Sequence, residues 1–215
     1  MITPLPPFAT FRADEFHIGG DPDVVDTIAS SWQQFGEECD NAASGMKSLD
    51  STSFEGTEGE RFTELVSLVL PSQLGITSEA HTEVGNAISG YAEGLATAHD
   101  DMDALIAQAK TDHTAVNNAV VRYEQAKLAA EAAKTAAAGV GGIAAPIALA
   151  AEAEVQEAKA HYYAMKEIWE HDLDRAKQIK ERLGEVVKKT VDTIDSEARE
   201  AFDSKPSGVQ EAISF

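Results

Sequence analysis

The sequence has few of the residues on which disulfide-stabilised and thick globular proteins depend. Its 215 residues include one cysteine, and aromatic residues make up 7%. A single cysteine excludes a disulfide framework within the chain. Because Cys39 stands among regularly spaced apolar positions, the sequence predicts a small buried residue there rather than a nucleophile. Scarce aromatics indicate a core of Ala, Val, Leu and Ile, as in closely packed helices.

Basic residues are also scarce. The chain has 17 Lys and Arg against 37 Asp and Glu, which gives a formal net charge of −20. A field of this sign repels the phosphates of nucleic acids and of anionic membranes. The composition therefore argues against nucleic acid and against a membrane surface as partners.

Two kinds of targeting segment are missing. Residues 1–16 contain three prolines and no basic start followed by an apolar run, which argues against a signal or transit peptide. No run of 18 or more strongly apolar residues occurs, and the charge-free stretch 135–151 is interrupted by three glycines and a proline, which predict a turn. If the protein leaves the cell, it must use a route without a cleaved signal.

Three stretches carry apolar or small residues at spacings of three and four, the pattern of a coiled-coil seam. They extend from Val25 to Leu49, from Val84 to Ala126 and from Val155 to Val186. The first seam comprises Val25, Ile28, Trp32, Phe35, Cys39, Ala42, Met46 and Leu49. The sequence therefore predicts an all-α protein, an elongated antiparallel helical bundle or coiled coil made of two successive helical hairpins.

Capping and turn residues place the expected helices. Asp21 suits an N-cap and Pro22 a first helical position, so the first helix should begin there. Turn formers follow Leu49, which predicts a hairpin tip near Phe54, and Pro71 with the nearby Gly75 should kink or break the return helix.

A very long helix is expected at about 77–138, a chain reversal at 140–146 and a final helix at about 147–201. This pattern divides the chain into a Pro-rich leader (1–20), a first hairpin (21–110), a long hairpin extension (111–203) with an apolar tip at 135–151, and a tail (204–215).

Polar residues interrupt both long seams at corresponding places. In an antiparallel hairpin whose paired residue numbers sum to about 284, Asp112 and His113 lie opposite His171 and Asp172. Two imidazoles and two carboxylates are suited to a divalent metal such as zinc or manganese. A polar layer with His–Asp pairing is the alternative, and we predict no metal and no cofactor because no second ligand pair follows at helical spacing. Without a catalytic motif elsewhere, the sequence predicts a protein that is not an enzyme.

The apolar tip of the second hairpin has two interpretations. Its larger side chains are Val140, Ile143, Ile147 and Leu149. An exposed apolar hairpin end can dock into the groove of a partner, whereas a structural tip would pack against its own bundle.

Several short features of the first hairpin occur together in one known family. They are Gly20-Asp21-Pro22, Trp32, Phe54-Glu55-Gly56, Glu60-Arg61-Phe62, Pro71 and Tyr91-Ala92. With them the chain resembles the N-terminal helical domain of actinobacterial type VII secretion substrates, relatives of the Trp-x-Gly helical-hairpin superfamily that also occur in polymorphic toxins. In that family a Trp-x-Gly turn joins two helices, and here Phe54 stands where the tryptophan is expected.

The resemblance implies export without a cleaved signal peptide, from the cytoplasm, through the type VII secretion machinery. It implies recognition through the hairpin (Trp32, Phe54 and Gly56) together with a Tyr-x-x-x-Asp/Glu motif, which Tyr163 and Glu167 match. It also implies a small Trp-x-Gly-type helical partner or a secretion chaperone. The chain would then be a stand-alone substrate or the delivery domain of a secreted toxin. The alternative is a cytoplasmic coiled-coil scaffold or adaptor.

Overall fold

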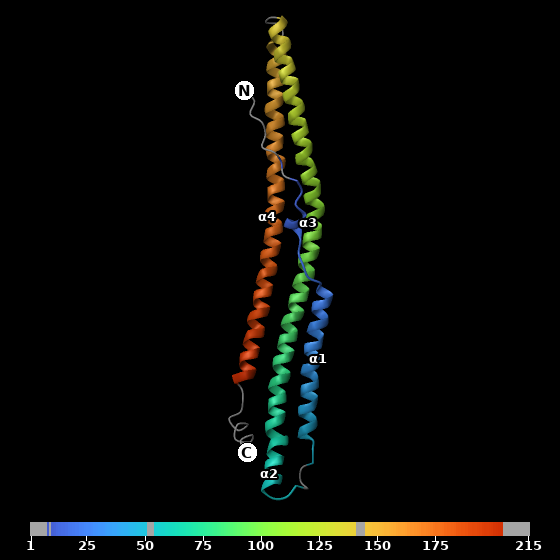
Figure 1. Ribbon diagram of the computed structural model, residues 1–215, viewed down its shortest axis with the longest axis vertical. Helices are drawn as coiled ribbons and strands as arrows, with labels where there is room; N and C mark the ends of the chain where they lie inside the picture. Colours follow the sequence, from blue (N-terminus) through green and yellow to red (C-terminus); the bar gives the residue numbers. More distant parts are fainter. Residues whose placement is uncertain (1–7, 9, 51–53, 141–144, 204–215) are drawn as a thin grey trace. The chain divides into compact units, whose positions relative to one another are not determined.

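The computed structural model describes residues 8, 10–50, 54–140 and 145–203, and these residues form helices and connecting segments without any strand. A 3-10 turn, η1 (Ala13–Phe16), precedes α1 (Pro22–Lys47), α2 (Thr57–Glu64), the π-helical turn η2 (Leu65–Val69), α3 (Leu70–Val140) and α4 (Ala145–Asp203) (Figure 1). The three long helices α1, α3 and α4 pack against one another as a bundle. The predicted all-α class is confirmed.

The chain folds as two compact units. Unit 1 contains Met1–Ile18 and His99–Lys180, and unit 2 contains Gly19–Ala98 and Glu181–Phe215. Each unit therefore takes one part of α3 and one part of α4. The division expected from the sequence, a first hairpin at 21–110 and an extension at 111–203, stays a prediction.

Unit 1 is an antiparallel hairpin of α3 and α4. Ion pairs join Lys134 to Glu152 at 2.7 Å and Arg122 to Glu157 at 2.9 Å, residue pairs whose numbers sum to 286 and 279. These sums lie on either side of the expected 284. Trp169 of the third seam is buried, whereas its neighbour Ile168 is exposed.

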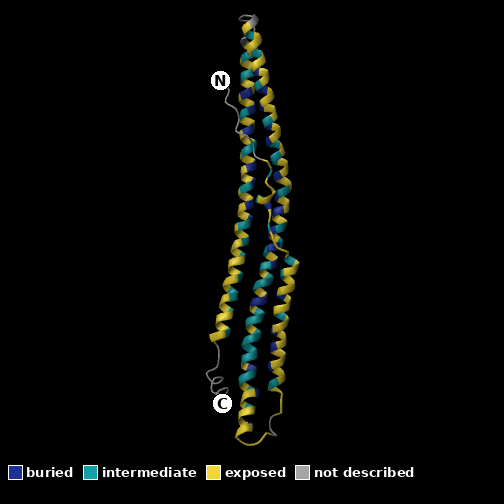
Figure 2. Cartoon of the chain, in the orientation of Figure 1, coloured by how far each residue is buried: buried dark blue, intermediate teal, exposed yellow. Residues whose placement is uncertain are grey.

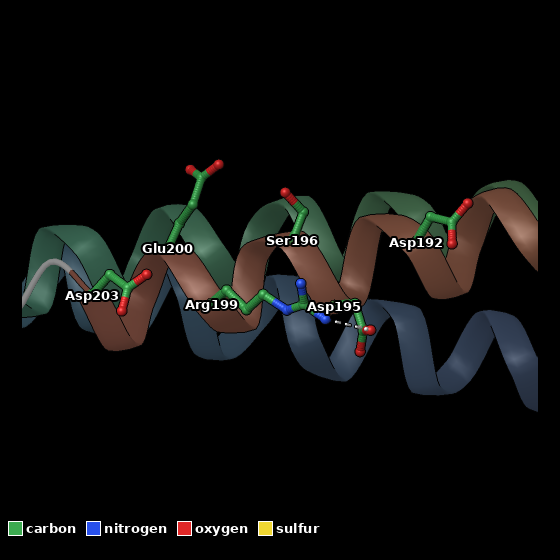
Figure 3. A pocket seen from close by; sticks show the side chains of 6 residues that line it. All are labelled: Asp192, Asp195, Ser196, Arg199, Glu200 and Asp203. Atoms are coloured by element: carbon green, nitrogen blue, oxygen red, sulfur yellow. Dashed lines mark ion pairs between the residues drawn. The ribbon is translucent and has the colours of Figure 1, made fainter.

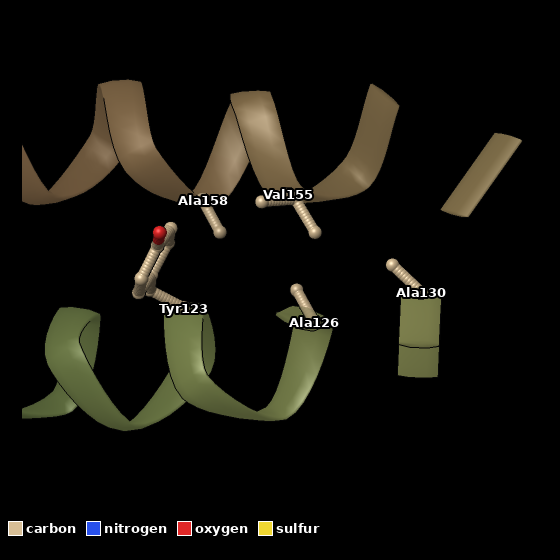
Figure 4. Packing of buried hydrophobic residues seen from close by; sticks show 5 residues of the cluster. All are labelled: Tyr123, Ala126, Ala130, Val155 and Ala158. Carbon is tan, nitrogen blue, oxygen red and sulfur yellow. The ribbon is translucent and has the colours of Figure 1, made fainter. Parts of the chain in front are cut away.

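The seams of unit 1 are buried between its two helices. Tyr123, Ala126 and Ala130 of α3 pack against Val155 and Ala158 of α4 in one apolar cluster (Figure 4). Small side chains on both helices let the backbones approach closely, and the faces turned away from the cluster are exposed (Figure 2). The parts of the second and third seams that lie in unit 1 are thus buried against each other within one chain.

In unit 2, α1 lies antiparallel to the first part of α3 (Figure 1). The predicted start of α1 is confirmed: Pro22 is its first residue, and the Asp21 carboxylate accepts a hydrogen bond of 3.0 Å from the Asp23 amide. Across the pair, the Gln33 side-chain amide donates to Asn86 at 3.0 Å.

The predicted first seam is wrong about which side chains α1 buries. The buried positions are Ala29, Gly36, Cys39 and Ala43, all small, while Ile28, Trp32 and Phe35 are exposed by 47%, 38% and 47%. The reason is close helix approach. A Cβ atom on Gly36 would lie 2.9 Å from the Ser78 carbonyl oxygen of α3, and one on Gly85 would lie 3.1 Å from the Ala29 carbonyl oxygen. Only small residues fit this contact, so the large ones are placed outside it.

Of the kink or break expected near Pro71 and Gly75, the break does not occur. The helix runs without interruption from Leu70 to Val140, and the irregularity precedes it, at η2, where the Leu70 amide bonds to the Leu65 carbonyl. Proline lacks an amide hydrogen and its ring crowds the carbonyl four residues earlier, so one wider π turn accommodates Pro71 without ending the helix.

Candidate functional site

The Phe-x-Gly turn has a geometry that depends on its two glycines. Gly56 is the N-cap of α2 with φ of +87°, a conformation that L-amino acids with a side chain rarely adopt. Gly59 is buried, and a Cβ atom there would overlap the Phe54 carbonyl. Phe54 itself is 54% exposed, with its ring centroid 4.8 Å from that of Phe62. The turn thus holds an aromatic pair at the end of the first hairpin.

Three large apolar side chains of α1 form a surface that we call the α1 strip: Ile28, Trp32 and Phe35. They lie on the flank of the contact with α3, and the imidazole of His81 from α3 stands beside two of them. Its ring centroid is 4.9 Å from that of Trp32, with the rings stacked, and 4.6 Å from that of Phe35. His81 Nδ1 lies 2.8 Å from the Thr77 carbonyl oxygen, which fixes the ring. The strip is therefore exposed, and its two aromatic side chains pack beside His81.

Tyr163 and Glu167 lie one turn apart on α4, and both are exposed. The neighbouring Tyr162 is fully buried and its hydroxyl has no hydrogen-bond partner among the described residues. Burial accordingly raises the pKa of the Tyr162 phenol. The structure presents the Tyr163–Glu167 pair on an open helical face in the middle of α4.

Part of the predicted apolar tip lies outside the described residues. This applies to Ile143 and to the side chain of Val140. Ile147 and Leu149, in the first turns of α4, are 65% and 70% exposed. Leu128, on α3 of the same unit, is 65% exposed. Apolar surface is therefore exposed in the first turns of α4 and at Leu128.

The four polar residues that interrupt the seams do not converge on one point. Asp112 and Asp172 face each other across the hairpin, whereas His171 is exposed and His113 faces aromatic rings. Among the described residues, no group of three or more His, Cys, Asp or Glu side chains could hold a metal ion. The chain instead brings two carboxyl groups together.

Asp172 is the one charged side chain among the buried residues of the described chain, with 2% exposure. Burial raises its pKa to about 6, and the hydrogen bond to Asp112 and the charge of that carboxylate act in the same direction. Arg175, 4.0 Å away, and His171 oppose the shift. Asp112 also accepts a 2.7 Å hydrogen bond from the Gln108 side-chain amide. Asp172 therefore binds a proton more readily than an exposed aspartate does.

Sequence reasoning missed an aromatic cluster around His113. Three phenylalanines of the expected leader, at positions 8, 11 and 16, contact His113 or Trp169 in unit 1. Their closeness in the sequence of a chain with 7% aromatic residues was the available signal. The leader is therefore partly a packed element of unit 1.

The last turns of α4 carry a shallow hollow bordered by acidic side chains. Figure 3 shows that all its labelled residues, from Asp192 to Asp203, come from α4 itself, with one ion pair of 3.5 Å between Arg199 and Asp195. On the same helix, partial burial and the nearby carboxylates Glu200, Glu83 and Glu79 raise the pKa of Glu197. This region is an open acidic helix face.

Comparison with known proteins places the chain in a family. Residues 12–203 match the family described as "Putative T7SS secretion signal domain", where T7SS denotes the type VII secretion system. The chain belongs to this family. The match includes the Phe-x-Gly turn, the α1 strip and the Tyr163–Glu167 pair within one secretion signal domain. No curated protein and no solved structure matches the chain.

Membership in the secretion signal family supports a role as a type VII secretion substrate. Such a signal implies interaction with the secretion machinery and export by a route that does not use a signal peptide. None of the helices in the described part of the chain is long and apolar enough to cross a membrane.

Proposed function

We propose that this signal domain is a type VII secretion substrate or the delivery domain of a secreted toxin, and that the machinery recognises it through its first hairpin. The observation that carries the proposal is the α1 strip within the matched secretion signal domain. Trp32 and Phe35 are large and exposed, and both pack against the ring of His81. Rigid exposed aromatics lose little conformational entropy on binding and are frequent anchors of protein interfaces.

The proposed partner of the strip is a helix, supplied either by a small Trp-x-Gly-type protein or by a component of the machinery. Ile28, Trp32 and Phe35 follow at spacings of four and three, which suits an amphipathic helix packed alongside α1. A secretion chaperone that binds the apolar surface at Ile147 and Leu149 would be a separate contact. Neither proposed contact requires an enzymatic activity of this chain.

The alternative, a cytoplasmic scaffold, has less support. A scaffold would assemble through its long seams, but the seam residues of α3 and α4 in unit 1 are buried against each other within one chain. The α1 strip is one of the apolar surfaces that stay exposed in unit 2.

The test is secretion of the full chain by hosts with and without a functional type VII system. We expect the combined variant Trp32→Ala and Phe35→Ala to reduce export about tenfold or more, because truncating an interface anchor weakens binding by about 1.4 kcal/mol or more. Both side chains are more than a third exposed, so the fold should be retained.

The matched control is the combined variant Val121→Ala and Ile168→Ala, which removes two exposed apolar side chains from unit 1. Its export should equal that of the wild type. Unchanged export of the Trp32 and Phe35 variant would refute recognition through the strip, and export from a host without the system would refute the secretion route.

Further variants test the Phe-x-Gly turn and the Tyr163–Glu167 pair separately. Phe54→Ala combined with Gly56→Pro should impair export, because proline cannot adopt the φ of +87° found at Gly56.

Tyr163→Ala should also impair export if the exposed Tyr163–Glu167 pair acts as a signal, whereas the exposed Ala164→Ser on the same helix should not. Equal secretion of Tyr163→Ala and Ala164→Ser would remove this pair from the signal.

A further inference from the structure

Residues 8 and 10–18, which we call the strap, pack on one face of the unit 1 hairpin. The ring of Phe16 is stacked on that of Phe11 with centroids 5.4 Å apart, and Phe16 is 2% exposed. The rings of Phe11 and Phe16 lie 5.5 and 5.8 Å from that of Trp169 on α4. The strap thus inserts two aromatic side chains against the hairpin.

The face beneath the strap, which we call the dock, consists of Trp169 from α4 and His113 from α3. Their ring centroids are 5.2 Å apart, so the two helices present one continuous aromatic surface. Phe8 contacts His113 at 5.1 Å and Phe11 contacts it at 5.6 Å. The Lys180 ammonium donates a hydrogen bond of 3.3 Å to the Asp14 carbonyl oxygen at the far end of the strap.

The attachment of the strap is made by side chains. The backbone hydrogen bonds of its described residues are local: the Glu15 amide bonds to the Arg12 carbonyl at 3.2 Å, and the His17 amide to the Asp14 carbonyl at 3.3 Å. No backbone–backbone hydrogen bond among the described residues joins the strap to α3 or α4. A segment held in this way can open without breaking the helical hydrogen bonds beneath it.

We propose that the dock is a binding site for an extended peptide bearing phenylalanine side chains, and that the strap of this same chain occupies it reversibly. In the closed form the strap shields Trp169, which is 6% exposed. In the open form, Trp169 and His113 become accessible and the strap is free. The proposal does not depend on the secretion role, because it concerns contacts within unit 1.

The first test uses fluorescence of the full chain. The sequence has two tryptophans, so Trp32→Phe leaves Trp169 as the one reporter. In this background, Phe11→Ala with Phe16→Ala should shift Trp169 emission to longer wavelength and increase its quenching by acrylamide severalfold, with helical circular dichroism retained. Arg12→Ala, an exposed strap position, is the matched control and should leave the emission unchanged. Unchanged emission in the phenylalanine variant, or loss of helix with it, would overturn the proposal of a detachable strap.

The second test adds the strap in trans. A synthetic peptide with the sequence of residues 8–18 should restore the shielded emission of the Phe11 and Phe16 variant, and the same peptide with alanine at positions 11 and 16 should not. A response to both peptides, or to neither, would overturn the assignment of the dock as a site for phenylalanine side chains.

Hydrogen exchange of the unmodified chain tests reversibility without any substitution. The amides of Glu15 and His17 should exchange about 100-fold faster or more than those of Ala119 and Tyr123 in α3, because local opening of the strap requires less free energy than opening of the helix. A common exchange rate for strap and helix would show that they open together and would contradict a detachable strap.

Discussion

Replacing Asp172 by asparagine is expected to stabilise the protein at pH 7.5, by an amount approaching 3 kcal/mol. The folded protein holds this carboxyl at a pKa of about 6, above the value of 3.8 expected for an unperturbed Asp, because the group is buried and faces Asp112. At about 1.36 kcal/mol per pKa unit, ionisation in the folded state is disfavoured by about 3 kcal/mol. An asparagine amide is neutral and can donate to the Asp112 carboxylate as the protonated acid does.

The sign of the pH dependence follows from the raised pKa. The folded state binds a proton more tightly than the unfolded state, so the contribution of Asp172 to stability is fully present below about pH 4 and is lost as pH rises through about 6. The difference between Asp172→Asn and wild type should therefore be near zero at pH 4 and largest above pH 7.

Urea unfolding followed by circular dichroism at pH 4, 5, 6 and 7.5 measures this difference. Asp174→Asn is the control, since it removes one negative charge from an exposed position of α4 two residues away. It reports the effect of making the formal net charge of −20 less negative by one. Its gain in stability over the wild type should depend little on pH. A gain for Asp172→Asn that is no larger than that of the control would contradict a strained carboxyl pair.

The second large effect is expected from a single methyl group between α1 and α3. Gly36→Ala should destabilise unit 2 by about 1–3 kcal/mol, because the added carbon would meet the Thr82 hydroxyl at 2.6 Å and the Ser78 carbonyl oxygen at 2.9 Å. The Thr82 side chain can rotate, but a backbone carbonyl can move only if the helices separate.

Gly45→Ala is the matched control on the same helix. No atom lies within 4 Å of the position that a Cβ atom would take there, so the helix-favouring effect of alanine should stabilise the protein by about 0.5–1 kcal/mol. Thermal or urea unfolding of the two variants should give shifts of opposite sign. If Gly36→Ala were as stable as Gly45→Ala, α1 would not approach α3 as closely as the structure shows.

The loss of α1 packing should also affect recognition. The α1 strip is positioned by this close contact, since His81 of α3 stands beside Trp32 and Phe35. We therefore expect Gly36→Ala to reduce export even though it changes no exposed side chain, whereas Gly45→Ala should be exported normally.

The sequence by itself determined the helical class, the start of α1 at Asp21 and Pro22, and the buried seams of the unit 1 hairpin with their approximate register. These features depend on local capping and on a periodic apolar pattern, both of which are read directly from residue spacing. The same pattern identified the two polar interruptions of the seams. It could not tell a metal site from a carboxyl pair, because a shift of one residue on a helix turns a side chain by about 100°.

Only the tertiary structure decided which side of α1 is buried. The apolar pattern favoured Trp32 and Phe35, but the approach of α3 admits only small residues, so Gly36 and Ala43 are buried and the aromatic side chains remain exposed. Tertiary structure likewise placed the strap on Trp169, an arrangement that joins residues more than 150 positions apart. Contacts of this kind depend on interhelical distance and on long-range side-chain packing, neither of which has a period in the sequence.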